Sequence, residues 1–270
     1  MGIEEFPSPE SAALEAASYI RRRHGIEEID ALLVLGSGWS AVKESIGSFD
    51  QKGLISDLPG FVSPIAEGHL NEYQLRKVAG VQVLILSGRT HLYEGMGSDQ
   101  VTHGVKTASA LGAKLCLLTN ACGSLRSEWK LGEPIVIRDH INLTSVSPID
   151  GSTFVDLTDC WDHELREAIH LRYPEMHEGI YAFMRGPNYQ TPAETKMLLT
   201  VGGDMVGMSG VLEAIVAHAA GLRVFGISLV SSLELSPSSI DSLEVVRIAS
   251  LGAQKCAKLV EDVIILSAHF

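Results

Sequence analysis

The sequence predicts a single α/β domain over residues 1–270, with a mixed, mostly parallel twisted sheet flanked by helices. Three observations support this prediction. Short apolar runs alternate with amphipathic stretches along the chain, 46% of the residues are hydrophobic, and glycine or hydroxyl residues directly follow most of the apolar runs. The sequence shows no repeat, low-complexity segment or linker. One sheet with helices on both faces therefore accounts for the whole length.

The first half of the chain reads as helix, strand, short helix, hairpin, helix and strand. Ser8 has the residue type of an N-cap, Pro9 suits the first helical position, and Gly25 is a typical helix end. The hairpin is predicted to turn at 79–80, and Ser98 to cap the helix after it. In order, these elements cover residues 9–24, 31–36, 39–47, 73–88, 98–113 and 114–123.

The second half reads as further strands and helices that end in one long helix. Thr191 is a predicted N-cap with Pro192 after it, and residues 144–154 are predicted to form a long surface loop. The elements are strand 133–143, helix 160–173, strand 179–187, helix 191–202, strand and helix 204–221, strand 222–232, and helix 241–267. In such sheets ligands bind at the carboxyl ends of the strands, so we expect the loops after the strands to converge on one site.

The charge balance and cysteine spacing exclude several classes of function. The chain has 21 Lys and Arg against 33 Asp and Glu, a formal net charge of -12, without a basic face for nucleic acid. No apolar run approaches the roughly 18 residues of a membrane helix. The four cysteines are scattered and form no C-x-x-C pair, which predicts reduced thiols and a cytoplasmic protein.

The strand ending at Leu35 runs into the turn 36–38, Gly-Ser-Gly, which aims backbone N–H groups at an anion. The stretch "GSGWSA" fits the loose dinucleotide fingerprint, with Asp57 as the acid that would follow it. Against that interpretation, Trp39 sits where a close-packed helix would open, and Asp57 lies in a predicted turn. A P-loop for a triphosphate is excluded because the Walker pattern is absent.

Free phosphate is the third candidate anion. It needs backbone N–H groups, hydroxyls and a bidentate cation, and Ser37, Arg89, His91 and Ser209 supply suitable side chains. Polar residues at the mouth of a buried strand, such as Arg89, His91 and Glu94, cost desolvation unless they are paired or used. The remaining histidines form no ligand pattern, and we expect no metal.

Seven segments, in order along nearly the whole chain, resemble the trimeric purine nucleoside phosphorylase family, which includes methylthioadenosine phosphorylases. They are "GSG" at 36–38, "EGH" at 67–69, "GRTHLYEG" at 88–95, "TNACGSL" at 119–125, "RDHINL" at 138–143, "GPNYQTPAE" at 186–194 and "VGMSGVLEAIVAHAAGLRVFGISLV" at 206–230. The resemblance implies a nucleoside phosphorylase type of fold. It also implies cleavage of a purine (deoxy)ribonucleoside by inorganic phosphate to free base and (deoxy)ribose-1-phosphate, without metal or organic cofactor.

The resemblance also implies roles for individual residues. His91, Glu94 and Ser232 are expected to be catalytic. No protein nucleophile is required, because a phosphate dianion beneath the anomeric carbon stabilises the oxocarbenium-like sugar and then attacks it. The expected phosphate contacts are Ser37, His69, Arg89, His91, the backbone of Ala121 and Ser209; the ribose contacts are Tyr93 and Met208; the base contacts are Tyr189, Gln190 and Ser232.

Base recognition departs from the usual family pattern. Gln190 stands where enzymes acting on inosine and guanosine carry Glu, and Ser232 stands where they carry an Asn that bonds the purine N7 edge. Near the ribose 5′-hydroxyl, Ser242 is the only candidate for the usual His. A glutamine amide can accept from N1–H or donate to a bare N1, so 6-oxopurines, adenine and methylthioadenosine-like bases all stay open.

Three functions follow as hypotheses. The first is a nucleoside phosphorylase. The second is a homologue on the same scaffold that binds phosphate but has altered base specificity, of adenine or methylthioadenosine type, or weak catalysis. The third, a dinucleotide-dependent oxidoreductase reading residues 36–41 as its fingerprint, is the least favoured. The resemblance further implies a homotrimer, with Phe154 as a candidate to complete a neighbouring ribose pocket.

Overall fold

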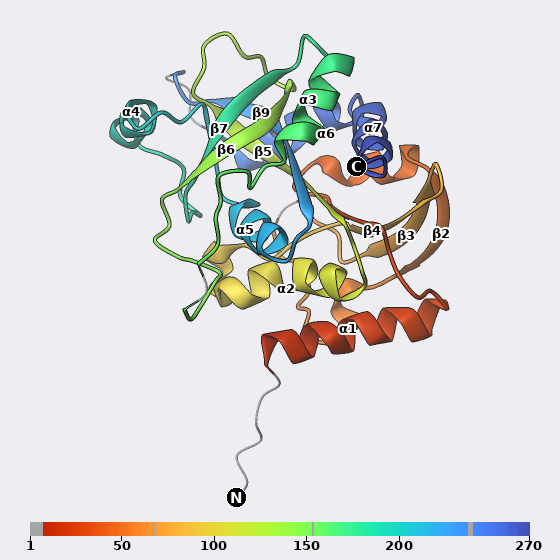
Figure 1. Cartoon of the computed structure of the whole chain (residues 1–270). Helices are drawn as coiled ribbons and strands as arrows, with labels where there is room; N and C mark the ends of the chain where they lie inside the picture. Colours follow the sequence, from red (N-terminus) through yellow and green to blue (C-terminus); the bar gives the residue numbers. More distant parts are fainter. Residues whose placement is uncertain (1–7, 67, 153, 237–239) are drawn as a thin grey trace, which may run out of the picture.

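A computed structural model describes residues 8–66, 68–152, 154–236 and 240–270. Its centre is a nine-stranded mixed sheet in the order β2-β3-β4-β1-β5-β8-β7-β6-β9 (Figure 1). The strands are β1 Ala31–Val34, β2 Ser48–Gly53, β3 Tyr73–Val78, β4 Val81–Leu86, β5 Leu115–Ser124, β6 Pro134–Asn142, β7 His177–Phe183, β8 Met205–Gly207 and β9 Arg223–Leu233. The predicted α/β fold with a mixed sheet is confirmed.

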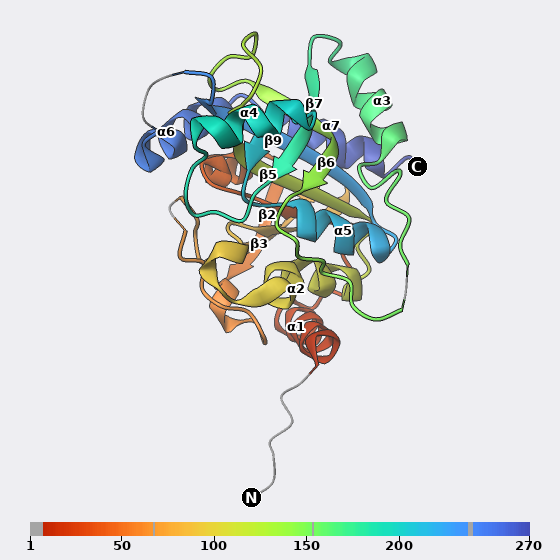
Figure 2. The same ribbon diagram turned by 90° about the vertical axis from the view of Figure 1, so that its left-hand side faces the viewer.

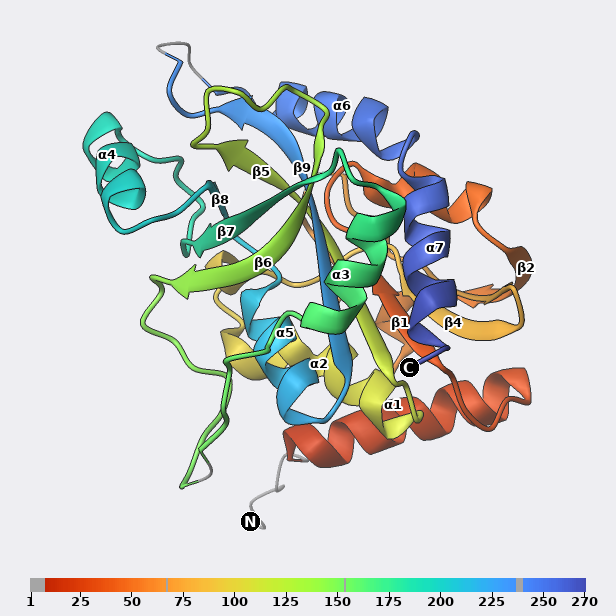
Figure 3. The same ribbon diagram turned by 45° about the horizontal axis from the view of Figure 1, so that its top comes forward.

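Part of the sheet closes on itself. β9 pairs in parallel with β5 from Leu115–Arg223 to Ser124–Leu233, in addition to its antiparallel pairing with β6. Strands β5, β8, β7, β6 and β9 therefore form a ring of neighbours, and their labels lie close together in Figure 3. Closure removes the free backbone groups that an edge strand would expose at this end of the sheet.

Helices cover the sheet on two sides because its central strands are buried on both faces. In β1, Leu32 and Val34 pack into one hydrophobic cluster while Ala31 and Leu33 pack into the other, the period-two pattern of a doubly covered strand. Figures 1 and 2 show α1, α2 and α5 on one side, with α3, α6 and α7 on the other. The helices are α1 Pro9–His24, α2 Gly97–Ala110, α3 His163–Arg172, α4 Pro192–Thr200, α5 Val211–Ala219, α6 Ser242–Ala253 and α7 Ala257–Ser267.

Several predicted boundaries are confirmed in atomic detail. Ser8 caps α1 by accepting from the Ser11 N–H, and Gly25 ends it in the left-handed conformation at φ 65°. Thr191 caps α4 with Pro192 in its first turn. The hairpin of β3 and β4 turns at 79–80. Within the described part of 144–154, the chain forms neither helix nor strand, as expected of a loop.

Three expectations for individual elements are wrong, whereas the short helix expected after the glycine turn is present as the 3-10 helix η1 Trp39–Ser45. Helix α2 begins at Gly97 with Met96 rather than Ser98 as its N-cap. Strand β2 was not expected, because its polar sequence, mostly exposed at the sheet edge, lacks an apolar run. The predicted long final helix is broken at 254–256 into α6 and α7. The break lets α6 pack on β9 and α7 on α3, which one straight rod could not do.

Candidate active site

The loops after the strands meet as expected. β1 is parallel to β4 and β5, and β5 is parallel to β9, so their carboxyl ends lie at one edge of the sheet. A cavity of about 380 Å³ opens at that edge. Ten residues expected from the sequence line it: Ser37, His91, Tyr93, Ala121, Tyr189, Gln190, Met208, Ser209, Ser232 and Ser242.

The turn after β1 has glycines for steric reasons. A Cβ on Gly36 would lie 2.5 Å from the Thr119 carbonyl oxygen, and one on Gly38 would lie 2.5 Å from the Ala249 Cβ. Gly38 also has φ +82°, a conformation that side chains rarely adopt. Trp39 follows fully buried and donates to the Asn120 carbonyl at 2.8 Å. Ser37 is therefore held at the cavity wall by a turn that is too tight for a side chain at position 36 or 38.

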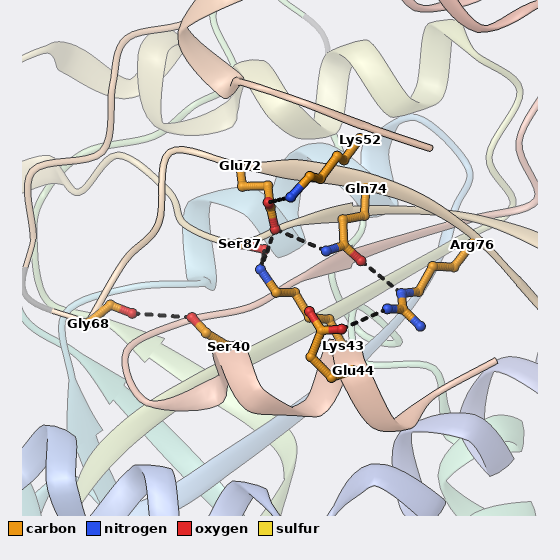
Figure 4. Close-up of polar contacts among 9 residues, drawn as sticks. All are labelled: Ser40, Lys43, Glu44, Lys52, Gly68, Glu72, Gln74, Arg76 and Ser87. Carbon is orange, nitrogen blue, oxygen red and sulfur yellow. Dashed lines mark hydrogen bonds and ion pairs between the residues drawn. The ribbon is translucent and has the colours of Figure 1, made fainter. Parts of the chain in front are cut away.

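A polar network behind η1 fastens this turn to the neighbouring strands (Figure 4). The buried Lys43 ammonium pairs with Glu72, and it donates to the Ser87 hydroxyl at 3.4 Å. Burial raises the pKa of Glu72, but hydrogen bonds from Lys43, Lys52 and Gln74 outweigh it and lower the pKa to about 2. Because Ser87 precedes the loop after β4, this network couples two loops of the site.

His91 is held by Glu94 across the short 3-10 helix η3 Leu92–Glu94. The Glu94 carboxylate accepts from the His91 backbone N–H at 2.8 Å and lies 3.1 Å from its ring Nδ1. The ring also stacks on Tyr93, with centroids 4.7 Å apart. Burial lowers the pKa of His91, although Glu94 opposes the shift. Glu94 itself does not line the cavity, but it orients His91, which does.

His69 and Arg89 lie behind the cavity wall. The His69 Nδ1 accepts from the Arg89 backbone N–H at 3.1 Å, and its ring lies 5.0 Å from that of His91. Burial, His91 and Arg89 lower the pKa of His69 to about 3, so the ring is neutral at pH 7. The Arg89 guanidinium lines a second, smaller cavity and its Nε lies 3.3 Å from the Glu213 carboxylate. The two side chains are 3% exposed.

Buried nitrogen donors remain unsatisfied in this region. Nε2 of His69, Nη1 of Arg89 and Nδ2 of Asn120 have no hydrogen-bond partner among the described residues, and Nε of Arg89 has only its ion pair with Glu213. A buried donor left unsatisfied costs about 1–3 kcal/mol. Because donors accumulate here, an oxyanion is the kind of group that would satisfy them.

Sequence reasoning missed two carboxylates. Glu213, in α5, accepts from the Gly210 N–H at 3.0 Å and pairs with Arg89, so it joins the turn that carries Ser209 to the loop after β4. It lies three residues after the N-cap Gly210, where a capping box has its Glu, but the sequence signature is incomplete because glycine replaces the usual Ser or Thr. Glu234 lines the cavity just after β9 and accepts from the Ser232 hydroxyl at 2.8 Å. No sequence signal singled it out, because it falls in a turn.

Two histidines outside the cavity have partners elsewhere in the fold. His140 accepts from the Trp161 indole N–H at 2.9 Å. His218 is partly buried and its Nε2 lies 2.9 Å from the Asp156 carbonyl oxygen. All four cysteines are unpaired and buried. Within the described ranges, no three His, Cys, Asp or Glu side chains are grouped to hold a metal ion, and no helix is long and apolar enough to cross a membrane.

The fold and the cavity place the chain in a known class. The family described as the phosphorylase superfamily matches residues 31–265, and the chain belongs to this family. Among curated relatives, a purine nucleoside phosphorylase of Cellulomonas sp is 43% identical over 262 residues, covering 94% of this chain and 93% of that protein. One of Mycobacterium tuberculosis is 44% identical over 260 residues, covering 96% and 97%.

A solved structure gives the same result. A Schistosoma mansoni purine nucleoside phosphorylase in complex with adenosine superposes with a TM-score of 0.85 at 27% identity, covering 93% of this chain and 95% of that one. The resemblance identified from sequence motifs is confirmed at the level of family and fold.

Proposed function

We propose that this protein is a purine nucleoside phosphorylase, which cleaves the N-glycosidic bond of a purine (deoxy)ribonucleoside with inorganic phosphate. The observation that carries the proposal is the set of unsatisfied buried donors beside a cavity lined by Ser37, His91 and Ser209. A phosphate dianion matches these donors in charge and geometry. The names of relatives similar over nearly the full length give independent support.

The residues divide the cavity into three regions. Ser37, the Ala121 backbone and Ser209 would hold phosphate, with His91 fixed toward it by Glu94. Behind them, Arg89 would supply positive charge and the neutral His69 ring a hydrogen bond. Tyr93 and Met208 would contact the ribose. At the other end, Tyr189, Gln190 and Ser232 would contact the base. As proposed, the reaction needs no metal or organic cofactor, since phosphate itself is the nucleophile.

The chemistry of this arrangement is charge stabilisation. As the glycosidic bond breaks, positive charge develops on the sugar and negative charge on the purine. The bound phosphate neutralises the first and forms the new bond to the anomeric carbon. Because His69 is neutral and the His91 pKa is lowered, these rings serve as hydrogen-bond donors or acceptors rather than as cations.

A phosphorolysis panel tests the proposal. Inosine, guanosine, xanthosine, adenosine and methylthioadenosine are incubated with the protein, with and without phosphate, and the free base is measured. We expect release from at least one nucleoside, only with phosphate. Absence of release from all five, together with calorimetric binding of phosphate, would favour the second candidate, a phosphate-binding homologue without catalysis. This second candidate is considered because Gln190 and Ser232 differ from the residues that the family usually carries at the base site.

We also propose a homotrimer in a reducing, cytoplasmic compartment. The trimer follows from the family resemblance, and the 98% exposure of Phe154 leaves this aromatic available to a neighbouring subunit. The four unpaired cysteines support the compartment. Sedimentation equilibrium tests the assembly: a species three times the 29.1 kDa chain is expected, and a monomer at assay concentrations would contradict it.

A further inference from the structure

The base end of the cavity contains an acidic side chain that the family resemblance does not assign. Glu234 lies in the turn directly after β9, and its backbone N–H donates to the Ser124 carbonyl at 3.0 Å. Its side chain lines the same cavity as Gln190 and Ser232. An acid in a pocket that otherwise presents amide, hydroxyl and apolar groups needs a physical reason, because burying a carboxyl is costly.

Two contacts fix the position of this carboxyl group. The Ser232 hydroxyl donates to Oε1 at 2.8 Å. The side chain also lies directly over Gly123 of β5, where a Cβ would meet the same Oε1 at 2.0 Å. The glycine therefore makes room for the acid, and the serine orients it. Ser232, where the family usually carries a longer amide, is short enough to share this space with Glu234.

The charges around Glu234 do not neutralise it. No Lys or Arg among the described residues forms an ion pair with it, and Cys122 beside it keeps its proton, since burial raises the pKa of that thiol to about 12. The other titratable groups on the cavity wall are His91, Tyr93 and Tyr189. On the adjoining α6, Glu244 and Arg247 pair with each other. Burial accordingly raises the pKa of Glu234, against the hydrogen bond from Ser232.

We propose that Glu234, held by Ser232 over Gly123, is the residue that gives a proton to N7 of the departing purine. This inference rests on the proposed function. In the step, the bond between the sugar carbon and N9 breaks and its electron pair passes into the purine ring. A phosphate oxygen forms the new bond to the sugar carbon. The Glu234 proton moves to N7, so the base leaves neutral.

The proton count closes without a further reactant. Hydrogen phosphate enters with one proton and becomes the singly protonated sugar phosphate, which loses that proton to water. The Glu234 carboxylate regains one proton from water before the next turnover. An acid in this role contributes about 10²–10⁴-fold to rate.

N7-methylated nucleosides provide the decisive test. Their purine is already positively charged at the imidazole ring and leaves without a proton from the enzyme. We take the best nucleoside of the panel and its N7-methylated counterpart and measure kcat for wild type, Glu234→Gln and Glu234→Asp. Glu234→Gln is expected to lose about 10²–10⁴-fold on the ordinary nucleoside and to keep its rate on the methylated one. Glu234→Asp retains an acid and is expected to fall between.

The pH profile supplies a second readout. With the ordinary nucleoside, wild-type kcat falls as pH rises through the raised Glu234 pKa, because the protonated form is the donor; Glu234→Gln lacks this decline. Glu244→Gln is the matched control, since this acid lies on α6 and pairs with Arg247 outside the cavity. It is expected to behave as wild type.

The remaining outcomes overturn the inference. Equal loss on both nucleosides means that Glu234 only shapes the pocket, and equal retention means that it does not contact the purine. Thermal melting of each variant, with and without phosphate, identifies a variant that has failed to fold, in which case Glu234→Asp decides. If the wild type releases no base from either nucleoside, the proposed function fails instead.

Discussion

At the residue scale, the buried pair of Arg89 and Glu213 shows how the site depends on groups that do not line the cavity. Its two charges lie 3.3 Å apart and are nearly inaccessible to water. Removing one partner of such a pair typically costs about 3–5 kcal/mol, because the other charge stays buried and alone. The pair therefore holds two loops in position, the loop after β4 and the loop before α5.

Mutating this pair separates its structural role from phosphate binding. Arg89→Ala is expected to lower stability by about 3–5 kcal/mol and to raise the KM for phosphate. The double variant Arg89→Ala/Glu213→Gln removes the unpaired carboxylate, so it should regain much of that stability but not the affinity. Urea unfolding and phosphate kinetics measure the two effects. An unchanged phosphate KM in either variant would contradict the role of Arg89.

Gln190 decides a second prediction at this scale. Gln190→Glu places a carboxylate where it can accept from N1–H of a 6-oxopurine, and a hydrogen bond to a charged group is worth about 1.5–3 kcal/mol. The ratio of kcat/KM for inosine over adenosine should therefore rise about tenfold or more. Gln254→Glu is the control, because it makes the same change on the surface far along the chain. An unchanged ratio would show that Gln190 does not touch the base.

Ten of the residues that line the cavity were expected from the sequence. Some follow apolar strands whose carboxyl ends meet, and the others were implied by the family resemblance. The sequence did not predict that Arg89 would turn toward Glu213, since side-chain direction depends on packing that strand patterns do not encode. Glu234 was missed for a related reason: its role comes from the space above Gly123, a contact between strands distant in sequence.

At the scale of elements, the network around Glu72 stabilises the 3-10 helix η1, which directly follows the turn 36–38. The Glu72 pKa of about 2 lies below its ordinary 4.5, so ionised Glu72 favours the folded state. This contribution is complete above pH 4.5 and is lost as pH falls toward 2. We expect Glu72→Gln to unfold at lower urea than wild type at pH 7.

The pH dependence of that difference is the sharper test. The gap between wild type and Glu72→Gln should narrow as the pH is lowered from 4.5 toward 2. Glu44→Gln is a suitable control, since Glu44 pairs with Arg76 from an exposed position and exposed pairs contribute about 0–1 kcal/mol. A stability difference between wild type and Glu72→Gln that stays constant with pH would mean that the partners of Glu72 do not lower its pKa.

The errors in predicted elements have physical causes at this same scale. Strand β2 lies at the sheet edge, where a polar sequence can pair without burial, so no apolar run marked it. The final two helices share one continuous apolar periodicity across a bend that tertiary packing imposes. Periodicity reports which residues are buried, and it is less informative about where a helix changes direction.

At the scale of the whole molecule, phosphate should stabilise the fold, because the anion would satisfy donors that folding buries. A ligand present at 100 times its Kd adds about 2.7 kcal/mol to the free energy of unfolding. Thermal unfolding in phosphate against chloride, at equal ionic strength, measures this. We expect a higher Tm in phosphate for wild type and a reduced gain for Ser37→Ala. Equal Tm values in both salts would argue against an anion site.

The pairing of β5 with β9 has a consequence for how the protein is made. The two strands are about a hundred residues apart in the sequence. While the chain emerges from the ribosome, β5 is therefore synthesised well before its partner β9 is available. During that interval its apolar edge is open to association with other nascent chains. Both walls of the nucleoside cavity depend on this late pairing of β5 with β9. Ligand binding would therefore report that synthesis and folding are complete, because no shorter fragment of the chain could form the cavity.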